Sequence, residues 1–375
     1  MNQPNDNLLS RQTRLFEKLQ LAGVDALAVN AGQNFTYLTG LNFYRNERPA
    51  IALFVPGKPV TFIIPNFEAS KAEAVTFPVQ IFTYEENPSL WHIAFEKAIA
   101  ALNLENSRIG VESGELRVFE LRLLEMAAKN ATFPSADAII NSLRVCKDND
   151  EIAAIQKAVD IAQEAFLATI KRIKIGMTEL ELASELTLQL LLAGSDVEIA
   201  FSPIIASGPN SANPHATPSE RRLEIGDVII IDWGARHNGY ISDLSRTVYL
   251  GRCDPEMEKI AKISEEATIA GCRAVRPGVA AGEIDRAARD VIERAGYGAY
   301  FKNRTGHGIG LDVHEEPYLF GENQQILVPG MTITVEPGIY LKGHGGVRFE
   351  DDVVVTADGA TVLSNLPRQL IAIHL

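Results

Sequence analysis

The fold of the second half of this 375-residue chain is decided by Val228-Ile229-Ile230-Ile231-Asp232-Trp233-Gly234-Ala235-Arg236-His237-Asn238-Gly239-Tyr240-Ile241-Ser242-Asp243. The β-branched run predicts a strand, and the polar Arg236–Gly239 stretch predicts the turn of an antiparallel hairpin. With the turn centred between His237 and Asn238, Asp232 lies directly opposite Asp243, with Cβ atoms roughly 4.5–5.5 Å apart. Two carboxylates so placed repel each other unless a cation lies between them. The hairpin therefore predicts a shared metal site.

A second hairpin repeats this arrangement further along the chain. A strand over 331–336 ends at Glu336, a glycine-rich turn follows over 342–346, and the return strand ends at Glu350. Centring the hairpin on Gly343 brings Glu336 opposite Glu350. His307 lies between glycines that allow close backbone approach and unusual φ/ψ angles. Buried charges need partners, and a metal ion is the strongest one available. Four carboxylates and one imidazole suit two divalent ions such as Mn²⁺ or Co²⁺ better than a thiolate-type structural zinc.

The remaining pattern predicts two domains that meet near residue 145. The first part mixes expected helices and strands, as an α/β domain would: helices over 10–22, 88–101 and 115–128, and strands over 26–29, 51–55 and 60–64. A charged stretch then leads into a long amphipathic helix over 151–170. Further helices are expected over 178–193, 255–274 and 282–295. Hairpins separate these helices, so the second part is predicted to be α+β with antiparallel strands.

Composition excludes several functional classes. The chain is 46% hydrophobic, enough for a sizeable core, and its net charge is −13. An acidic chain without a Lys/Arg block is a poor candidate for binding nucleic acid or an anionic membrane. No apolar run approaches the roughly 18 to 20 residues that span a bilayer. The three cysteines form no CxxC pair, which favours a reducing, cytoplasmic setting over a disulfide framework.

At its acidic hairpins the chain resembles the pita-bread metallopeptidases, a group that includes prolidase, aminopeptidase P, methionine aminopeptidase and creatinase. The resemblance is strong over residues 145–375 and weaker in the N-terminal part, through Tyr37-Leu38-Thr39-Gly40. It rests on Asp232-Trp233-Gly234 with Gly239-Tyr240-Ile241-Ser242-Asp243, Gly306-His307-Gly308-Ile309-Gly310-Leu311-Asp312-Val313-His314-Glu315, Val335-Glu336-Pro337-Gly338-Ile339-Tyr340 and Gly346-Val347-Arg348-Phe349-Glu350-Asp351. It implies an α+β chain: a creatinase-like N-terminal α/β domain (1–145) for dimerisation and site capping, then a pita-bread catalytic domain (146–375).

The resemblance also implies a metal-binding role for each of the five residues. Asp232 would chelate one metal ion, and His307 and Glu336 would bind the other. Asp243 and Glu350 would bridge the two ions. A hydroxide held by both metals would attack the scissile carbonyl, with Glu336 shuttling the proton. Mn²⁺ is the expected metal, and Co²⁺ and Zn²⁺ remain possible with these ligands.

Three further residues have implied catalytic roles outside the ligand set. His215 and His314 would hydrogen-bond the substrate carbonyl and the tetrahedral intermediate, which stabilises developing charge. Arg348 lies two residues before Glu350 and would support the bridging carboxylates from the same strand face. His237 and His344 lie in predicted turns and are interpreted as solvent-exposed. No GxSxG motif or activated cysteine is present, so a serine or cysteine nucleophile is not expected.

Within the group, the N-terminal region of about 145 residues argues against methionine aminopeptidase and favours a homodimeric peptidase that cleaves Xaa-Pro bonds in di- or oligopeptides. One position leaves the substrate length open. Many prolidases carry an arginine after their His-Glu-x-Pro stretch, and this chain has Tyr318 there. A dipeptidase and an aminopeptidase P therefore remain comparable readings. Arg45 and Arg48 of the N-terminal domain could supply positive charge to the partner subunit's site. The alternative function is a metal-free creatinase-like C–N hydrolase acting on a small amidino or N-acyl compound.

Overall fold

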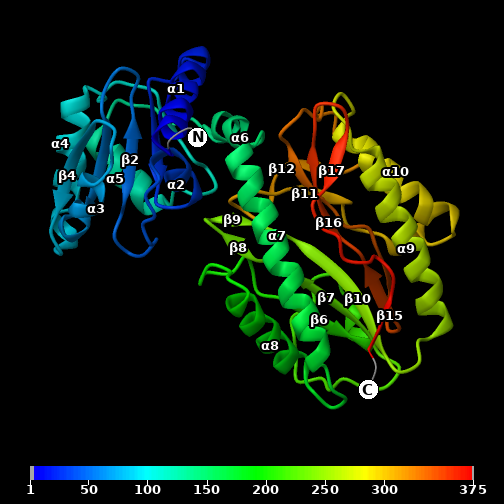
Figure 1. Ribbon diagram of the computed structural model, residues 1–375. Coiled ribbons are helices and arrows are strands. Elements are labelled where there is room, and N and C mark those ends of the chain that lie inside the picture. The colour runs from blue at the N-terminus through cyan, green and yellow to red at the C-terminus, as the bar shows by residue number, and fades with distance from the viewer. Residues whose placement is uncertain (1–3, 374–375) are drawn as a thin grey trace. The chain divides into compact units, whose positions relative to one another are not determined.

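The computed structural model describes residues 4–373 and divides into two compact units, Met1–Arg144 and Val145–Leu375 (Figure 1). The first unit contains a five-stranded sheet in the order β4-β3-β2-β1-β5, and the second contains a four-stranded sheet, a five-stranded sheet and two short hairpins.

The N-terminal unit is a mixed sheet with helices on its faces. β1, β2 and β3 are antiparallel, whereas β4 and β5 are added in parallel. Helices α4 and α5 cover one face, where Phe95, Ile99 and Leu124 pack on the strands. The strands are β1 (Ala26–Asn30), β2 (Ile51–Phe54), β3 (Val60–Pro65), β4 (Val79–Tyr84) and β5 (Ile109–Val111). The helices are α1 (Pro4–Ala22), α2 (Gln33–Thr39), α3 (Ala69–Glu73), α4 (His92–Leu102), α5 (Val118–Ala127) and α6 (Asp137–Arg144), with short 3₁₀ turns η1 (Asn66–Glu68) and η2 (Pro88–Leu90).

The expected hairpin of strands 51–55 and 60–64 is confirmed by the β2–β3 pairing. Gly57 takes a positive φ of 76° in its turn. Helix α1 begins at Pro4, six residues before the predicted start, because proline is well suited to a first helical turn. Helices α2 and α6 were not predicted, since seven and eight residues are too few for a clear helical period.

The C-terminal unit is built on two antiparallel sheets, apart from one parallel pair, β10 with β18. The strand orders are β18-β10-β7-β6 in the first sheet and β12-β11-β13-β16-β17 in the second, while β8-β9 and β14-β15 form separate hairpins. The strands are β6 (Ile204–Ser207), β7 (Val228–Trp233), β8 (Arg236–His237), β9 (Tyr240–Ile241), β10 (Leu244–Leu250), β11 (Gly306–Gly308), β12 (Glu315–Leu319), β13 (Thr332–Val335), β14 (Gly338–Leu341), β15 (Gly345–Arg348), β16 (Asp351–Val355), β17 (Ala360–Val362) and β18 (Ile371–Ile373).

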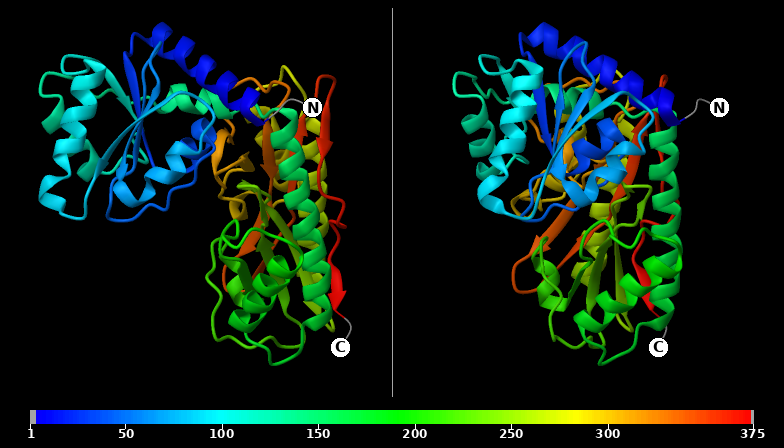
Figure 2. Two further views of the ribbon diagram at one scale, coloured as in Figure 1. Left: turned by 60° about the vertical axis from the view of Figure 1, so that its left-hand side comes forward. Right: turned by 90° about the vertical axis from the view of Figure 1, so that its left-hand side faces the viewer.

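Two pairs of helices flank these sheets, and both pairs are visible in Figures 1 and 2. Helices α7 and α8 lie beside the first sheet, where the ring of Phe166 stacks on Trp233 with centroids 4.6 Å apart. Helices α9 and α10 pack against the second sheet through Ile284 and Cys272. The helices are α7 (Asn149–Thr169), α8 (Glu179–Leu192), α9 (Pro255–Ala274) and α10 (Ala281–Arg294), with 3₁₀ turns η3 (Ile170–Arg172), η4 (Gly208–Ala212) and η5 (Gly298–Tyr300). Thr178 caps α8 and forms a capping box with Glu181.

The register predicted for the first acidic hairpin is wrong. Asp232 pairs with Ser245, and Asp243 lies in the short segment between β9 and β10. The cause is the turn, because Asn238 and Gly239 both have positive φ angles, 52° and 82°. A two-residue turn of this kind requires positive φ at both central residues, which selects Asn-Gly as the turn centre. The centre therefore lies one residue later than predicted, and the two aspartates are diagonal rather than direct neighbours.

The second acidic hairpin has the predicted register. Gly338 pairs with Arg348 in one ladder, and Val335 pairs with Asp351 in the next. Two residues separate these pairs on each strand, so Glu336 and Glu350 lie opposite each other. The two sheets meet at this point through an isolated bridge between Ser245 and Glu350.

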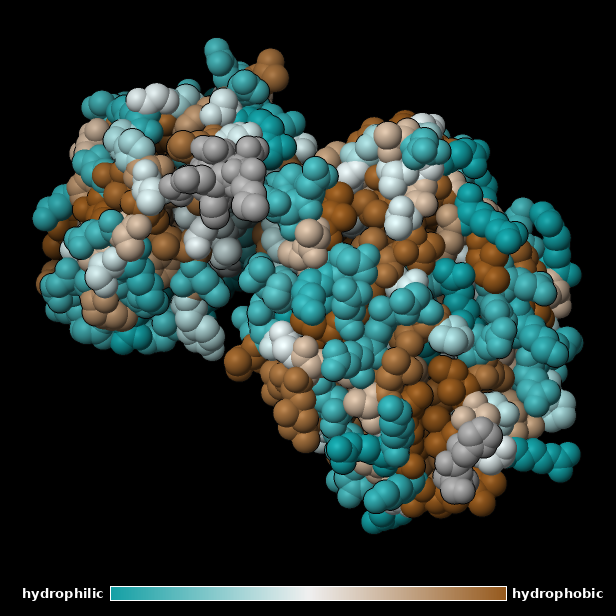
Figure 3. All heavy atoms as spheres, viewed as in Figure 1, coloured by the Kyte–Doolittle hydropathy of each residue, from teal (hydrophilic) through white to brown (hydrophobic). Residues whose placement is uncertain are grey.

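The outer surface of the C-terminal unit mixes polar and apolar residues on the face that Figure 3 shows. Some large apolar side chains are exposed, among them Leu192 at the end of α8 and Val197 in the following loop. Such scattered exposure is normal for a globular protein. Within residues 4–373, no helix is both long and apolar enough to cross a membrane.

Candidate active site

The five predicted metal-ligand residues line one cavity of about 410 Å³ in the C-terminal unit. The first sheet contributes Asp232 at the end of β7, and Asp243 just precedes β10. The second sheet contributes His307 from the middle of β11 and Glu336 directly after β13. Glu350 lies between β15 and β16, where the chain passes from one ladder to the next. The site therefore forms only where the two sheets meet.

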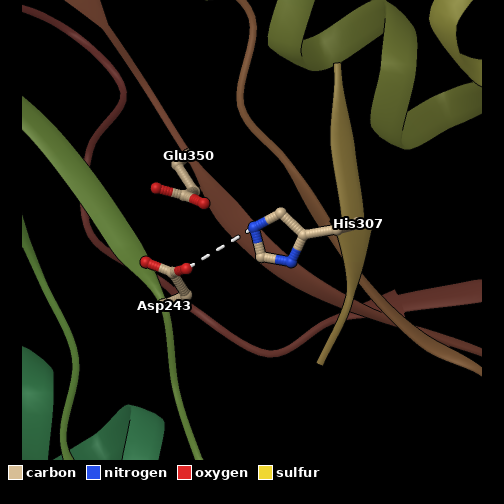
Figure 4. A group of neighbouring side chains, drawn as sticks. All are labelled: Asp243, His307 and Glu350. Atoms are coloured by element: carbon tan, nitrogen blue, oxygen red, sulfur yellow. Dashed lines mark ion pairs between the residues drawn. The ribbon is translucent and has the colours of Figure 1, made fainter. Parts of the chain in front are cut away.

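Asp243, His307 and Glu350 point toward one another, as Figure 4 shows. One ligand atom from each lies within 4.8 Å of the other two. The Nε2 atom of His307 is 3.7 Å from Asp243 Oδ2 and 3.4 Å from Glu336 Oε1. Its Nδ1 atom is 3.0 Å from the carbonyl oxygen of Gly308. A neutral imidazole that donates from Nδ1 to this carbonyl presents a lone pair at Nε2, which is the form that binds a metal ion.

The donor set fits a cation. Asp232 Oδ1 is buried and has no hydrogen-bond partner among residues 4–373. A buried carboxylate oxygen without a partner is costly, and coordination of a metal ion removes that cost. The atoms around it are carboxylate oxygens and one imidazole nitrogen, with no thiolate lining the cavity. Such ligands suit Mn²⁺, Co²⁺ or Zn²⁺ rather than a soft-metal site.

Burial gives these groups unusual acid–base properties. Burial, and then the charges of Glu350 and Asp232, raise the pKa of Asp243 well above its usual value. Burial and the neighbouring Glu336 do the same to the pKa of Glu350. The pKa of Glu336 rises to about 7, mainly through burial. Burial lowers the pKa of His307 to about 3, so this imidazole is neutral near pH 7. The protein's own groups therefore do not neutralise the negative charge of these acids, whereas bound cations would.

Arg348 connects two of the acidic residues. Its Nη2 donates to Asp232 Oδ2, and its Nε donates to Ser245 Oγ at 2.9 Å. The Ser245 hydroxyl in turn donates to Glu350 Oε2 at 2.7 Å. Arg348 Nη1 also donates to the hydroxyl oxygen of Tyr340 at 2.8 Å. Arg348 thus contacts Asp232 directly and reaches Glu350 only through Ser245.

The two additional predicted histidines line the same cavity. The ring of His314 meets that of His307 edge-on, with centroids 4.3 Å apart. Burial, and then the charge of Arg304, lower the pKa of His314. His215 is exposed in the loop that follows η4. The structure thus brings all eight predicted site residues to one cavity. Of the two turn histidines, His344 is exposed as expected, whereas His237 is half-buried in β8.

Sequence reasoning missed a residue that holds the His215 loop. Glu179, the first residue of α8, is fully buried. Its Oε1 accepts hydrogen bonds from the amide and hydroxyl of Ser207, both at 2.7 Å. Its Oε2 accepts from the amide and hydroxyl of Ser219, at 3.1 and 2.6 Å. The Asn210 side chain adds a further donor. The local sequence showed only an acid in a first helical turn, so it gave no signal for this role.

Two other missed residues are Tyr340 and Arg304. Tyr340 appeared only as part of a quoted motif, but its hydroxyl accepts a hydrogen bond from Arg348, and burial raises its pKa to about 12. Arg304 lines the cavity three residues before His307. A lone arginine before a glycine-flanked histidine carries no recognisable spacing signal.

The chain belongs to metallopeptidase family M24. Residues 153–357 match that family, and residues 11–146 match the creatinase/prolidase N-terminal domain. Both matches confirm the predicted resemblance and the predicted fold class, a creatinase-like domain followed by a pita-bread domain. Membership makes this chain a metallopeptidase, an enzyme of a family that uses divalent metal.

Individual relatives cover almost the whole chain. A curated Xaa-Pro dipeptidase of Pyrococcus horikoshii is 33% identical over 98% of this chain and 100% of its own length. The crystal structure of a dipeptidase from the same organism has a TM-score of 0.91 at 38% identity and covers 96% of this chain and 99% of that one. An X-Pro aminopeptidase from Thermotoga maritima has a TM-score of 0.84 at 31% identity, with coverages of 96% and 99%. Proteins named as dipeptidases and as an aminopeptidase therefore both occur among similar proteins.

Proposed function

We propose that this protein hydrolyses Xaa-Pro peptide bonds with two divalent metal ions, most simply Mn²⁺, held by Asp232, Asp243, His307, Glu336 and Glu350. The observation that carries the proposal is the shared cavity, where these residues gather and where Asp232 Oδ1 is buried without a hydrogen-bond partner among residues 4–373. Similar proteins of nearly equal length are named Xaa-Pro dipeptidase and X-Pro aminopeptidase, which supports the choice of substrate.

The bound ions would polarise the scissile carbonyl and lower the pKa of a water molecule. The protein's own residues have separate tasks. Arg348 holds Asp232 through Nη2, and Ser245 holds Glu350, so both carboxylates keep one orientation. His215 and His314, at the cavity wall, would donate hydrogen bonds to the scissile carbonyl oxygen as it gains negative charge. Glu336 would accept a proton at its carboxylate and pass it to the leaving proline nitrogen, which must be protonated to depart as an amine.

The cavity also offers an apolar wall. Its apolar side chains are those of Phe201, Ile204, Pro214 and Val313. A few apolar groups beside polar ones are typical of small-ligand sites. The pyrrolidine ring of proline is compact and apolar. When proline follows the scissile bond, its amide nitrogen carries no hydrogen and needs no hydrogen-bond acceptor. This wall therefore supports proline at the position after the cleaved bond.

We also propose that the protein is a cytoplasmic homodimer whose N-terminal domain, expected over 1–145, mediates dimerisation and caps the site. Arg45 and Arg48 could bring positive charge to a partner's site. Within the N-terminal unit, Arg45 pairs with Glu115, and Arg48 pairs with Glu86 at 2.7 Å. These pairs would have to open before either arginine could bind a substrate. Light scattering of the purified protein tests the dimer.

The proposed chemistry is tested with Ala-Pro and Ala-Pro-Ala before and after chelation. The untreated protein is expected to cleave at least one of them, to bind about two divalent ions per chain by elemental analysis, and to regain activity with added Mn²⁺. Full activity after complete metal removal would exclude the dinuclear mechanism. Turnover of a creatine-like compound without bound metal would instead support the alternative C–N hydrolase.

A further inference from the structure

The wall of the catalytic cavity carries two arginines, and they differ in their partners. Arg348 is bonded to Asp232, Ser245 and Tyr340 and is 2% exposed. Arg304 is half-buried, and within residues 4–373 its guanidinium has no hydrogen bond and no ion pair. Its five N–H donors are therefore available to a ligand in the cavity. An unpaired guanidinium beside a substrate site can bind a carboxylate specifically, because its planar set of N–H donors matches the two carboxylate oxygens.

Arg304 is nevertheless held in place. Its Cζ atom lies 4.4 Å from the centroid of the Tyr318 ring. Stacking on an aromatic face fixes the plane of a guanidinium without using its N–H donors. Tyr318 thus positions the cation and leaves its hydrogen-bonding edge open.

The backbone on both sides of Arg304 is also fixed by helix α10. Arg289 Nη2 donates to the carbonyl of Asn303 at 3.0 Å, and Asp285 Oδ1 accepts from the Thr305 amide and hydroxyl at 3.2 and 2.7 Å. Arg289 is a useful contrast with Arg304. It also stacks on an aromatic ring, that of Phe301 at 4.2 Å, but its guanidinium is paired with Asp285. Arg289 is therefore structural. Arg304 lies on a segment whose backbone is hydrogen-bonded to α10, and its own donors have no partner in the described part of the chain.

The chemistry of the proposed substrate supplies a matching anion. In an Xaa-Pro dipeptide the C-terminal carboxylate is attached to the proline Cα, only three bonds from the scissile carbonyl carbon. A dipeptide whose scissile carbonyl lies at the acidic cluster therefore places this carboxylate at the wall of the same cavity. The other charged residues there are the four acids of the cluster and the fully engaged Arg348. Arg304 is the available cation for a negatively charged group.

We propose that Arg304, stacked on Tyr318, binds the C-terminal carboxylate of the substrate and makes the enzyme prefer Xaa-Pro dipeptides to longer Xaa-Pro peptides. This inference rests on the proposed function and specifies its substrate class. A longer peptide has a neutral amide where the dipeptide has its carboxylate, so it loses a charge-assisted pair. In this chain the carboxylate-binding arginine is thus Arg304. The position after the His-Glu-x-Pro stretch is occupied by Tyr318.

The first test compares Ala-Pro with Ala-Pro amide, which has nearly the same size but no C-terminal charge. With the Mn²⁺-loaded full-length protein, kcat/KM is expected to be roughly 10- to 100-fold higher for Ala-Pro, the range for one charge-assisted hydrogen-bonded pair. Ala-Pro-Ala is expected to behave like the amide. Equal rates on Ala-Pro and its amide would overturn the assignment of Arg304 while leaving the proposed peptidase function intact. No cleavage of any of the three would instead refute the peptidase function.

The second test uses Arg304→Met, with Arg304→Gln as a second variant should the first fold poorly. Either variant is expected to raise KM for Ala-Pro roughly 10- to 100-fold with little change in kcat, and to leave the amide unaffected. Arg304→Lys keeps the charge without the planar fork and should recover part of the loss. Arg294→Met is the matched control, because Arg294 is 78% exposed and pairs only with Asp290 on the surface of α10. Equal losses on the dipeptide and the amide would show a structural role and overturn the proposal.

A binding measurement supplies a readout that needs no turnover. Free proline carries the carboxylate, and prolinamide does not. Proline is expected to inhibit the wild type more strongly than prolinamide, and Arg304→Met should remove that difference. Tyr318→Leu removes the aromatic face and should weaken proline binding by several-fold. A preference for proline that survives in Arg304→Met would assign the carboxylate to another residue.

Discussion

Both units bury carboxylates, but they surround them differently. In the N-terminal unit, Glu112 is 1% exposed and accepts hydrogen bonds from the Asn30 amide and the Asn34 side chain, both at 2.7 Å. In the C-terminal unit, the Asp243 carboxylate accepts no hydrogen bond from residues 4–373 and faces the lone pair of His307. The polar atoms of a buried acid that is surrounded by donors are satisfied within the fold, whereas a buried acid that faces other acceptors needs a cation.

Glu179 shows that this difference does not separate the two units as such. It belongs to the C-terminal unit, lies near the site, and still has donors at both oxygens. The contrast is therefore between acids that organise the chain and acids that remain unsatisfied. Substitution should therefore affect metal binding and activity at the unsatisfied acids, and stability at the acids that have donors.

The largest effect is expected for Asp243→Asn. The change removes one proposed metal ligand, so kcat/KM on Ala-Pro should fall by more than the roughly 10- to 100-fold typical when a supporting residue outside the ligand set is lost. Bound metal, measured by elemental analysis, should fall as well. The melting temperature of the metal-free protein should not decrease, because a neutral amide relieves repulsion from Glu350 and Asp232. Asp290→Asn, in an exposed pair, is the control. Unchanged turnover in Asp243→Asn would show that the bridging role is wrong.

A smaller effect, on stability first, is expected for Glu179→Ala. The truncation leaves the buried donors of Ser207 and Ser219 without an acceptor, so the free energy of unfolding should fall by about 4 kcal/mol. The loop that carries His215 should loosen, and kcat should fall with it. Urea unfolding and steady-state kinetics measure the two effects. Glu220→Ala changes an exposed acid in the same loop and should alter neither. A stable, fully active Glu179→Ala would mean that this carboxylate does not organise the loop.

The smallest effect is expected for Glu112→Gln, and it depends on pH. Burial raises the pKa of Glu112 to about 7 from the usual 4.5. The folded state therefore holds a proton that the unfolded state releases, so the wild type loses stability as pH rises from 4.5 to 7. Glutamine cannot ionise and should remove about 2 kcal/mol of that loss between pH 5 and 8. Urea unfolding at several pH values measures the difference. Identical pH profiles for the two proteins would place the pKa of Glu112 near its ordinary value.

The strand register was predicted correctly for one acidic hairpin and wrongly for the other. For the second, the positions of Glu336 and Glu350 around a glycine-rich turn gave the correct register. For the first, the residues were identified but the pairing was two positions off, because the positive φ angles of Asn238 and Gly239 fix the turn centre. The predicted ligand residues still lie together despite this error, because some of them come from the second sheet. A diagonal pair of aspartates still reaches the same cavity.

The helices α7 to α10 of the C-terminal unit followed from local signals, such as the capping box at Thr178. Short elements of the N-terminal unit, such as α2, did not, because they are set by contacts rather than by periodicity. The same holds for the supporting residues. Glu179 and Ser207 are 28 positions apart, and Arg348 and Asp232 are 116 apart. No local pattern encodes such pairs.

The sequence by itself determined the chemistry: the identity of the five candidate ligands, the two acidic hairpins, the α+β plan and the family. These features depend on residue type and short spacing, which a linear chain displays directly. The tertiary structure decided which acids have donors and how the two sheets bring Asp232 and Asp243 to His307 and Glu350. It also decided that Arg304 stacks on Tyr318 and that its donors have no partner among the residues that the structure describes. The physical reason is that burial and hydrogen-bond satisfaction depend on neighbours distant in the chain, and only the folded structure brings those neighbours together.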